Sequence, residues 1–224
     1  MLQSLGRFQP PPGRLVLPDV CCDVTFARGR QFFTGPMTHA RASLHVGHDI
    51  VILRIGVTAA RQLLQVPLSE LTDLTVPLEE INRSLARELA ERFETGRLVE
   101  SFAQRALTTA DTRFAAAARR LARGCSVQAA AAVVALSERQ LERLFNDQAG
   151  VTPKMFARIV RFRRAIIAAR QGTSLAEAAA AHGYADQSHF TREVRALTDR
   201  SPRSLLPDVA SVQDATSWRN VGCE

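Results

Sequence analysis

The strongest constraint in this sequence of 224 residues is an internal repeat in its second half. Five positions recur with related residue types at an offset of 49 positions. Each copy has a short helix, a tight turn, a capped helix with one polar face, and then a proline. This order predicts two helix-turn-helix units in one chain. The matching residues are Ser137, Leu141, Arg143, Phe145 and Pro153 in the first copy, and Asp186, Phe190, Arg192, Val194 and Pro202 in the second.

Cap residues and glycines predict where the helices of this half begin and end. A Ser or Asp side chain at an N-cap accepts hydrogen bonds from the first backbone N–H groups, and Gly commonly ends a helix. Pro suits the first helical turn because its missing N–H group has no partner there. The predicted elements are a helix at 111–123, units at 126–148 and 174–198 whose second helices span 138–148 and 187–198, a joining helix at 153–170, and a short turn from Pro202.

The joining helix sets the distance between the two units. Its 18 residues, at a rise of about 1.5 Å each, span roughly 27 Å. With the helix radii added, this length approaches the roughly 34 Å between successive major-groove faces of duplex DNA. One chain is therefore expected to read two neighbouring groove segments without dimerising.

The basic charge of the chain is concentrated in the same segment. Residues 108–208 hold 16 basic and 9 acidic residues, a net charge of +7, whereas residues 1–107 have a net charge of +1 and residues 209–224 of −1. Every basic residue except Lys154 is arginine, whose planar fork suits phosphates and guanine edges. This asymmetry indicates that the second half meets a polyanion.

The polar faces of the two second helices carry side chains that read base edges. Arg donates two hydrogen bonds to guanine, Gln makes two hydrogen bonds with adenine, and Glu accepts a hydrogen bond from cytosine. Arg143 and Arg192 occupy equivalent positions of the repeat and are the first candidates. For any single residue, a solvated face with pairs such as Arg139–Glu142 is the alternative. The expected base-contacting residues are Arg139, Gln140, Glu142, Arg143, Gln187, Ser188, Thr191 and Arg192.

A second set of residues is expected on the DNA backbone. Helix N-termini offer backbone N–H groups to phosphate, and long cationic side chains reach it directly. For Arg161, an ion pair within the fold is an equal alternative. The expected phosphate-contacting residues are Ser137, Lys154, Arg158, Asp186 and Arg195.

The first half is predicted to be α+β. Short β-branched or aromatic runs, punctuated by Pro and Gly, predict three to five strands. A short helix follows from Val57 and is expected to stop at Pro67, and a four-residue apolar period predicts a longer helix over 78–101. The small polar residues 103–110 are expected to form a linker. The predicted strands lie at 14–17, 22–26, 31–34 and 50–55.

Two stretches, SERQLERLFNDQAGVTPKMFARIVRFRRA and AAAAHGYADQSHFTREVRALTDRSP, resemble AraC/XylS-type transcriptional regulators. The resemblance covers about residues 108–206. It implies a monomeric tandem helix-turn-helix domain that activates or represses promoters, and it places the base-reading sites on the same eight residues. Three positions depart from the family pattern: Ala130 and Ala178 replace bulkier apolar residues, and Asp199 replaces Gly after the second reading helix.

The stretches RLVLPDVCCDVTFARG and FFTGPMTHA are similar to the small cupin-like domain that precedes some of these regulators, with Val20 in place of the usual Gly. The implied domains are a sensor or dimerisation domain at 1–105, β-rich to about residue 56 and helical over 57–102, then a DNA-binding domain at 106–208 and a flexible tail at 209–224. Besides double-stranded DNA, the implied partners are RNA polymerase, a small-molecule effector and a second copy of the chain held through residues 1–105.

An alternative function is a metal- or thiol-responsive sensor that uses Cys21 and Cys22 with His45 and His48, with DNA binding secondary. A purely structural interaction protein is a third class. No HExxH, CxxC, GxSxG or Walker motif is present, so we expect no enzyme, no bound metal and no cofactor. No signal peptide or long apolar run is apparent, so we expect a cytoplasmic, nucleoid-associated protein without a membrane contact.

Overall fold

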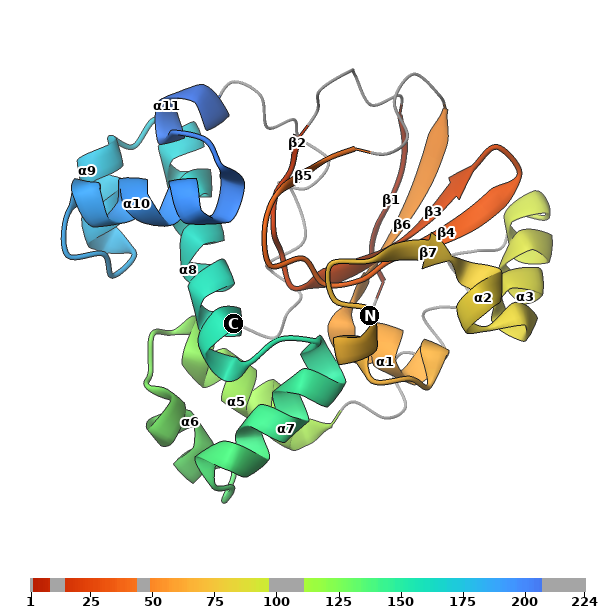
Figure 1. Ribbon diagram of the computed structural model, residues 1–224, viewed down its shortest axis with the longest axis horizontal. Coiled ribbons are helices and arrows are strands. Elements are labelled where there is room, and N and C mark those ends of the chain that lie inside the picture. Colours follow the sequence, from red (N-terminus) through yellow and green to blue (C-terminus); the bar gives the residue numbers. More distant parts are fainter. Residues whose placement is uncertain (1, 9–14, 44–48, 97–110, 207–224) are drawn as a thin grey trace.

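The computed structural model describes residues 2–8, 15–43, 49–96 and 111–206. A β-rich half and a helical half lie side by side, and the longest helix joins the two groups of helices within the helical half (Figure 1). The predicted fold class, an α+β half followed by an all-α half, is confirmed. The expected linker at 103–110, the tail at 209–224 and the domain boundary near residue 105 all lie outside the described ranges.

The first half is built on an antiparallel sheet of five strands in the order β1-β6-β3-β4-β7, with a separate two-stranded sheet of β2 and β5. Short helices follow the strands and pack on one face of the larger sheet. The elements are β1 (Leu2–Phe8), β2 (Leu15–Val16), β3 (Cys21–Ala27), β4 (Arg30–Thr34), β5 (Arg41–Ala42), β6 (Ile50–Gly56), α1 (Val57–Leu64), the 3-10 turn η1 (Leu68–Glu70), β7 (Thr75–Pro77), α2 (Leu78–Ile81) and α3 (Arg83–Glu94).

The second half consists of helices whose boundaries match the predicted caps closely. Ser126, Ser137 and Ser174 each accept from the backbone N–H three residues on, and Asp186 does the same for α10. Gly150 ends α7 with a φ of 69°, in the left-handed region that Gly tolerates best. The helices are α5 (Thr112–Ala122), α6 (Val127–Val133), α7 (Glu138–Ala149), α8 (Pro153–Arg170), α9 (Leu175–Ala181), α10 (Gln187–Thr198) and α11 (Pro202–Leu205).

Three expectations for the first half were wrong. The region 57–102 is not all helical, because β7 pairs with β4 through the register Thr34↔Thr75. The helix predicted over 78–101 is interrupted at Asn82, whose extended backbone (φ −150°) and side chain instead cap α3. The helix α1 ends at Gln65 in a left-handed conformation and not at Pro67. The seven-residue strand β1 and the short strands β5 and β7 were not predicted, because their pairing partners lie far away in the sequence.

A cluster of buried charges lies between the larger sheet and α8. Arg54 on β6 makes a two-pronged ion pair with Asp23 on β3, through Nε and Nη2 at 2.9 and 2.8 Å, and donates through Nη1 to Asp19 at 2.8 Å. Arg163 of α8 is 1% exposed. Burial lowers the pKa of the Arg163 guanidinium, and the Asp19 carboxylate opposes this shift. Two carboxylates and two guanidiniums therefore balance in charge where the two halves meet.

Removal of one member of this cluster leaves the others buried and uncompensated. We expect Arg54→Met to lower the free energy of unfolding by about 3–5 kcal/mol. The matched control is Arg30→Met, which breaks the exposed ion pair of Arg30 with Glu79 and should cost about 0–1 kcal/mol. Urea unfolding followed by circular dichroism measures both free energies of unfolding. If the two variants lose the same stability, the buried cluster contributes no more than an exposed ion pair.

Both halves meet at the C-terminal ends of α7 and α10. Arg61 of α1 pairs with Asp147 of α7 at 3.0 Å, and the Thr72 hydroxyl donates to the Gly150 carbonyl at 2.6 Å. Near the other end of α8, the Ala40 N–H donates to the Leu197 carbonyl at 2.7 Å. One apolar core continues from the sheet into the first helical unit, and Leu17 belongs to the core of the second.

Gly150 is required at this junction for two reasons. A Cβ atom there would lie 2.6 Å from Thr72 Oγ1 and 2.8 Å from the Leu68 carbonyl oxygen, and φ is +69°. Gly172, with φ +98° and no atom within 4 Å of an added Cβ, offers a matched control. Gly172→Ala should cost about 1–2 kcal/mol through backbone conformation alone. Gly150→Ala should cost on the order of 1–3 kcal/mol more through overpacking, measured by thermal unfolding. If Gly150→Ala and Gly172→Ala lower the stability equally, the residues around Gly150 can move to make room for a methyl group.

Candidate nucleic-acid interface

The first helix-turn-helix unit consists of α6, a turn and α7. The inner face of α7 buries Leu141, Phe145 and Ala149, and the Phe145 ring contacts those of Phe114 and Phe156 at centroid distances of 4.8 and 5.3 Å. The opposite face is turned to solvent. On that face the four residues expected to contact bases are all exposed, namely Arg139, Gln140, Glu142 and Arg143.

The second unit repeats this arrangement with α9, a turn and α10. Phe190, Val194 and Leu197 form the buried face of α10, and the Phe190 ring lies 5.0 Å from that of Tyr184. Of the residues expected to contact DNA from this helix, Thr191 is half-buried. The others are exposed, namely Gln187, Ser188, Arg192 and Arg195.

Small residues allow the first helix of each unit to approach its partner closely. Ala130 of α6 and Ala178 of α9, the two departures from the family pattern, are both fully buried. The turn of the first unit places Ala135 at φ 52°, whereas the turn of the second places Gly183 at φ 76°. The third departure, Asp199, adopts φ 54° as the C-cap of α10, a conformation that Asp tolerates better than most residues.

The caps of the reading helices already use some of the groups expected to contact DNA. The Ser137 N–H donates to Gln140 Oε1 at 2.8 Å, and Ser137 Oγ accepts from the Gln140 N–H at 3.2 Å. The Gln140 amide oxygen is therefore occupied, which leaves its NH2 group for a base. Asp186 accepts from the His189 N–H at 2.6 Å, and its negative charge opposes a phosphate beside it.

The sequence did not identify Glu193 as important, although it ties the joining helix to the second reading helix. Glu193 is 9% exposed, and its Oε1 accepts from Arg158 Nε at 2.9 Å and Arg161 Nη2 at 3.4 Å. The Arg161 guanidinium also lies 4.7 Å above the centre of the Tyr184 ring. The ion-pair alternative for Arg161 thus has direct structural support. The position of Glu193 next to Val194, within the apolar stripe of α10, is the sequence signal that could have identified this contact.

One helix, α8, contributes to the cores of both units. Phe156 and Ile159 pack in the core of the first unit, and Phe162 and Ile166 pack in the core of the second. Figure 1 shows α6 and α9 on the side of α8 that lies away from the sheets. Lys154 is exposed in the first turn of α8, where a long cationic side chain extends into solvent.

Of the residues of the sensor alternative, the structure describes only the two cysteines. Cys21 and Cys22 are 3% and 0% exposed on β3, and His45 and His48 lie outside the described ranges. Within the described residues, no group of three His, Cys, Asp or Glu side chains is placed to hold a metal ion. Burial raises the pKa of both thiols, so they remain protonated in the folded chain.

The protonation of these thiols gives a direct test of thiol sensing. In a Cys223→Ser background at pH 8, we expect a disulfide reagent to modify the half-buried Cys125 of the native protein and to reach Cys21 and Cys22 only after unfolding, since the thiolate is the reactive form. Thiol titration with and without urea measures this difference. Rapid modification of Cys21 or Cys22 in the native protein would restore the sensor hypothesis.

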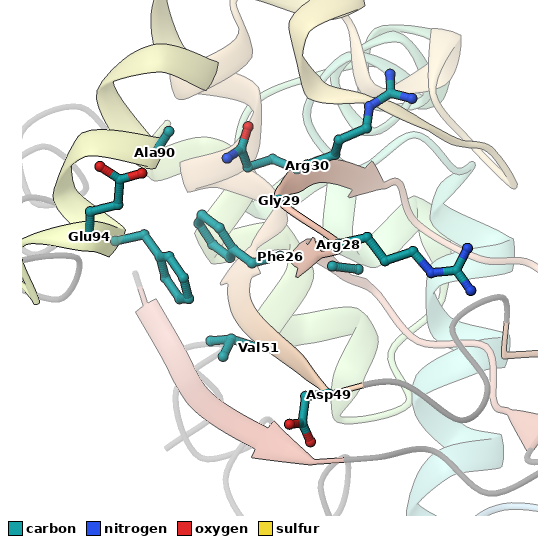
Figure 2. Close-up of a pocket in the computed structure, with 11 residues that line it drawn as sticks. Phe26, Arg28, Gly29, Arg30, Asp49, Val51, Ala90 and Glu94 are labelled. Carbon is teal, nitrogen blue, oxygen red and sulfur yellow. The ribbon is translucent and has the colours of Figure 1, made fainter.

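The first half also contains a cleft of about 410 Å³ between α3 and the turn that joins β3 to β4. Figure 2 shows Phe26 and Val51 facing α3, while the side chains of Arg28 and Arg30 extend away from them. The Phe26 ring stacks on that of Phe93 at 4.5 Å. The cleft therefore has an apolar floor and a charged rim.

Comparison with known families matches residues 130–207 to a family described as a helix-turn-helix domain. This range begins within α6 of the first unit and includes all of the second unit. This match confirms the class that the fold defines: the protein is a DNA-binding transcriptional regulator. The matched segment, residues 130–207, is a helix-turn-helix domain of the AraC type, as the resemblance in the sequence implied.

A comparison with curated proteins gives no match. Among solved structures, a 1.65 Å structure of ToxT from Vibrio cholerae is 10% identical, with 93% of this chain and 98% of that chain covered and a TM-score of 0.47. Wild-type ToxT of strain SCE256 with a bound unsaturated fatty acid is 13% identical, with 95% and 96% covered and a TM-score of 0.46. In the described part of this chain, no helix has the length and apolar character of a membrane span.

Proposed function

We propose that the protein binds two successive major-groove segments of duplex DNA, with α7 in one segment and α10 in the next. The observation that carries this proposal is the shared helix α8. Its 18 residues join two units of the same design, and a helix of that length spans roughly 27 Å. Because each unit anchors its core on α8, we expect the two units to be held at a spacing near the roughly 34 Å that separates successive major-groove faces.

Arg143 and Arg192 are the proposed centre of base recognition. Both are exposed and occupy equivalent positions on α7 and α10. A guanidinium donates two parallel hydrogen bonds to guanine O6 and N7, which makes each arginine selective for guanine. The other residues proposed on bases are Arg139, Gln140, Glu142, Gln187, Ser188 and Thr191.

The proposed phosphate contacts divide into two groups. Lys154 and Arg195 are exposed and extend cationic groups into solvent. Arg158 is engaged by Glu193, so its first role is to position α10, and contact with phosphate is secondary. At Ser137 and Asp186, contact depends on the backbone N–H groups of the first helical turn rather than on the capping side chains.

For the first half, we propose a regulatory role. The cleft beside α3 is our candidate for the small-molecule effector, because it offers an apolar floor with polar groups at its rim. We further propose a homodimer through residues 1–105, contact with RNA polymerase at the promoter, and a cytoplasmic location on the nucleoid. Light scattering of the purified protein and of a chain lacking residues 1–105 tests the proposed dimer.

The two equivalent arginines provide the test of base recognition. An operator is first selected from a random duplex library with the wild-type protein. We expect Arg143→Ala and Arg192→Ala each to lose about 1–3 kcal/mol of binding free energy for that operator, while binding to unrelated duplex changes little. Fluorescence anisotropy measures both affinities.

The matched control is Arg87→Ala, which removes an exposed arginine from α3 in the other half of the molecule. It should leave operator affinity close to that of the wild type. Unchanged operator affinity in both reading-helix variants would contradict the assignment. Binding to duplex that does not depend on salt would contradict DNA reading altogether, since phosphate contacts release counterions.

A further inference from the structure

A second cleft, of about 530 Å³, lies between the two helix-turn-helix units. One wall is the end of α5 and the turn that leads to α6, and the other is the end of α9 and the turn that leads to α10. The floor is α8, through Ala157, Arg161 and Arg164. Neither reading helix contributes a side chain to this lining, so the cleft is separate from the base-reading faces.

The lining of this cleft is cationic. It contains Arg123, Arg161, Arg164 and His182, and it contains no Asp or Glu. Arg123 is exposed at the mouth, whereas Arg164 is half-buried. Burial, followed by the Arg164 guanidinium, lowers the pKa of His182, as expected where nearby charge is positive.

Part of this positive charge is balanced within the protein. Arg164 Nη1 donates to the Ala122 carbonyl at the end of α5, and Arg161 contacts Glu193 at 3.4 Å. The C-termini of α5 and α9 each carry the equivalent of about −0.5 charge. Arg158 shares the charge of Glu193, so the three guanidiniums of the lining keep a positive excess after the two helix ends are counted. Such an excess favours an anion.

The Arg161 guanidinium is held from two sides. Its Nε–H group is buried and makes no hydrogen bond of good geometry to another described residue, although the Tyr184 hydroxyl interacts with the same guanidinium. The Glu193 contact and the Tyr184 ring hold this guanidinium in place, so its position is set before a ligand arrives.

We propose that this cleft holds one phosphodiester of the DNA backbone, in the stretch that lies between the two major-groove segments. This inference rests on the proposed function, because it places the duplex across both units. The backbone between two grooves read by α7 and α10 must pass the gap between their units, and the cleft lies in that gap. Arg123 and Arg164 receive the phosphate oxygens, with His182 beside them.

The test uses Arg123→Gln in the full chain, because Arg123 is exposed and its change leaves the Arg164 contact with α5 intact. Affinity for a mixed-sequence duplex that spans both groove segments is measured against salt by anisotropy. Loss of one phosphate contact should reduce the slope of log affinity against log salt by about 0.9, which weakens binding about fivefold near 0.15 M salt. The loss should be equal on operator and on unrelated duplex.

Arg87→Gln on α3 is the matched control, since it removes the same charge far from the cleft. It should leave the salt slope unchanged. A second comparison separates a backbone phosphate from a free one: the melting temperatures of the wild type and of Arg123→Gln are measured in sodium phosphate and in sodium chloride at equal ionic strength. Phosphate raises melting temperatures in general, so we expect the difference between the two salts to be the same for the wild type and for Arg123→Gln.

Three outcomes overturn the proposal. If Arg123→Gln and Arg87→Gln have the same slope while Arg143→Ala still loses operator binding, DNA reading stands and the cleft assignment fails. If inorganic phosphate stabilises the wild type more than Arg123→Gln, and the slope is unchanged, the cleft is a site for a free anion. If the wild type shows no salt-dependent binding, the proposed function fails together with this inference.

Discussion

The packing of α8 against both helix-turn-helix units is the constraint on which the rest of the structure depends. Ile159 and Phe162 stand three positions apart on one rigid helix, yet they belong to different cores. A close-packed core does not allow such a helix to rotate or slide on its own. The relative placement of α7 and α10 is therefore fixed by side chains that never contact DNA.

The first half acts on the same two helices. It contacts the C-terminal end of α7 through Asp147 and Gly150, and the C-terminal end of α10 through Leu197. The N-terminal ends of both helices are left to present their exposed residues. A movement of the sheet relative to either unit would break these contacts, and the buried charges of Asp19, Arg54 and Arg163 oppose such movement.

Much of the second half was predictable because its signals are local. An N-cap Ser, a Pro in the first turn and a Gly after the last turn act within four residues of a helix end. The predicted starts at Ser126, Ser137 and Pro153 therefore agree with the structure. The first half was harder to predict, because strands as short as β2 and β5 form only where they pair with each other. Asn82 is a common N-cap residue, but it lies within an apolar repeat that predicted one continuous helix, so its cap was missed.

The sequence by itself determined the repeat, the helix boundaries of the second half and the exposed faces of α7 and α10, since periodicity and capping are properties of neighbouring residues. Only the tertiary structure decided that Glu193 holds Arg158 and Arg161, that Arg163 lies buried near Asp19, and that two turns about sixty residues apart form one cationic cleft. These features depend on which helices pack together. Which helices pack together depends on the shape of the whole core, and this cannot be predicted from any short stretch of sequence.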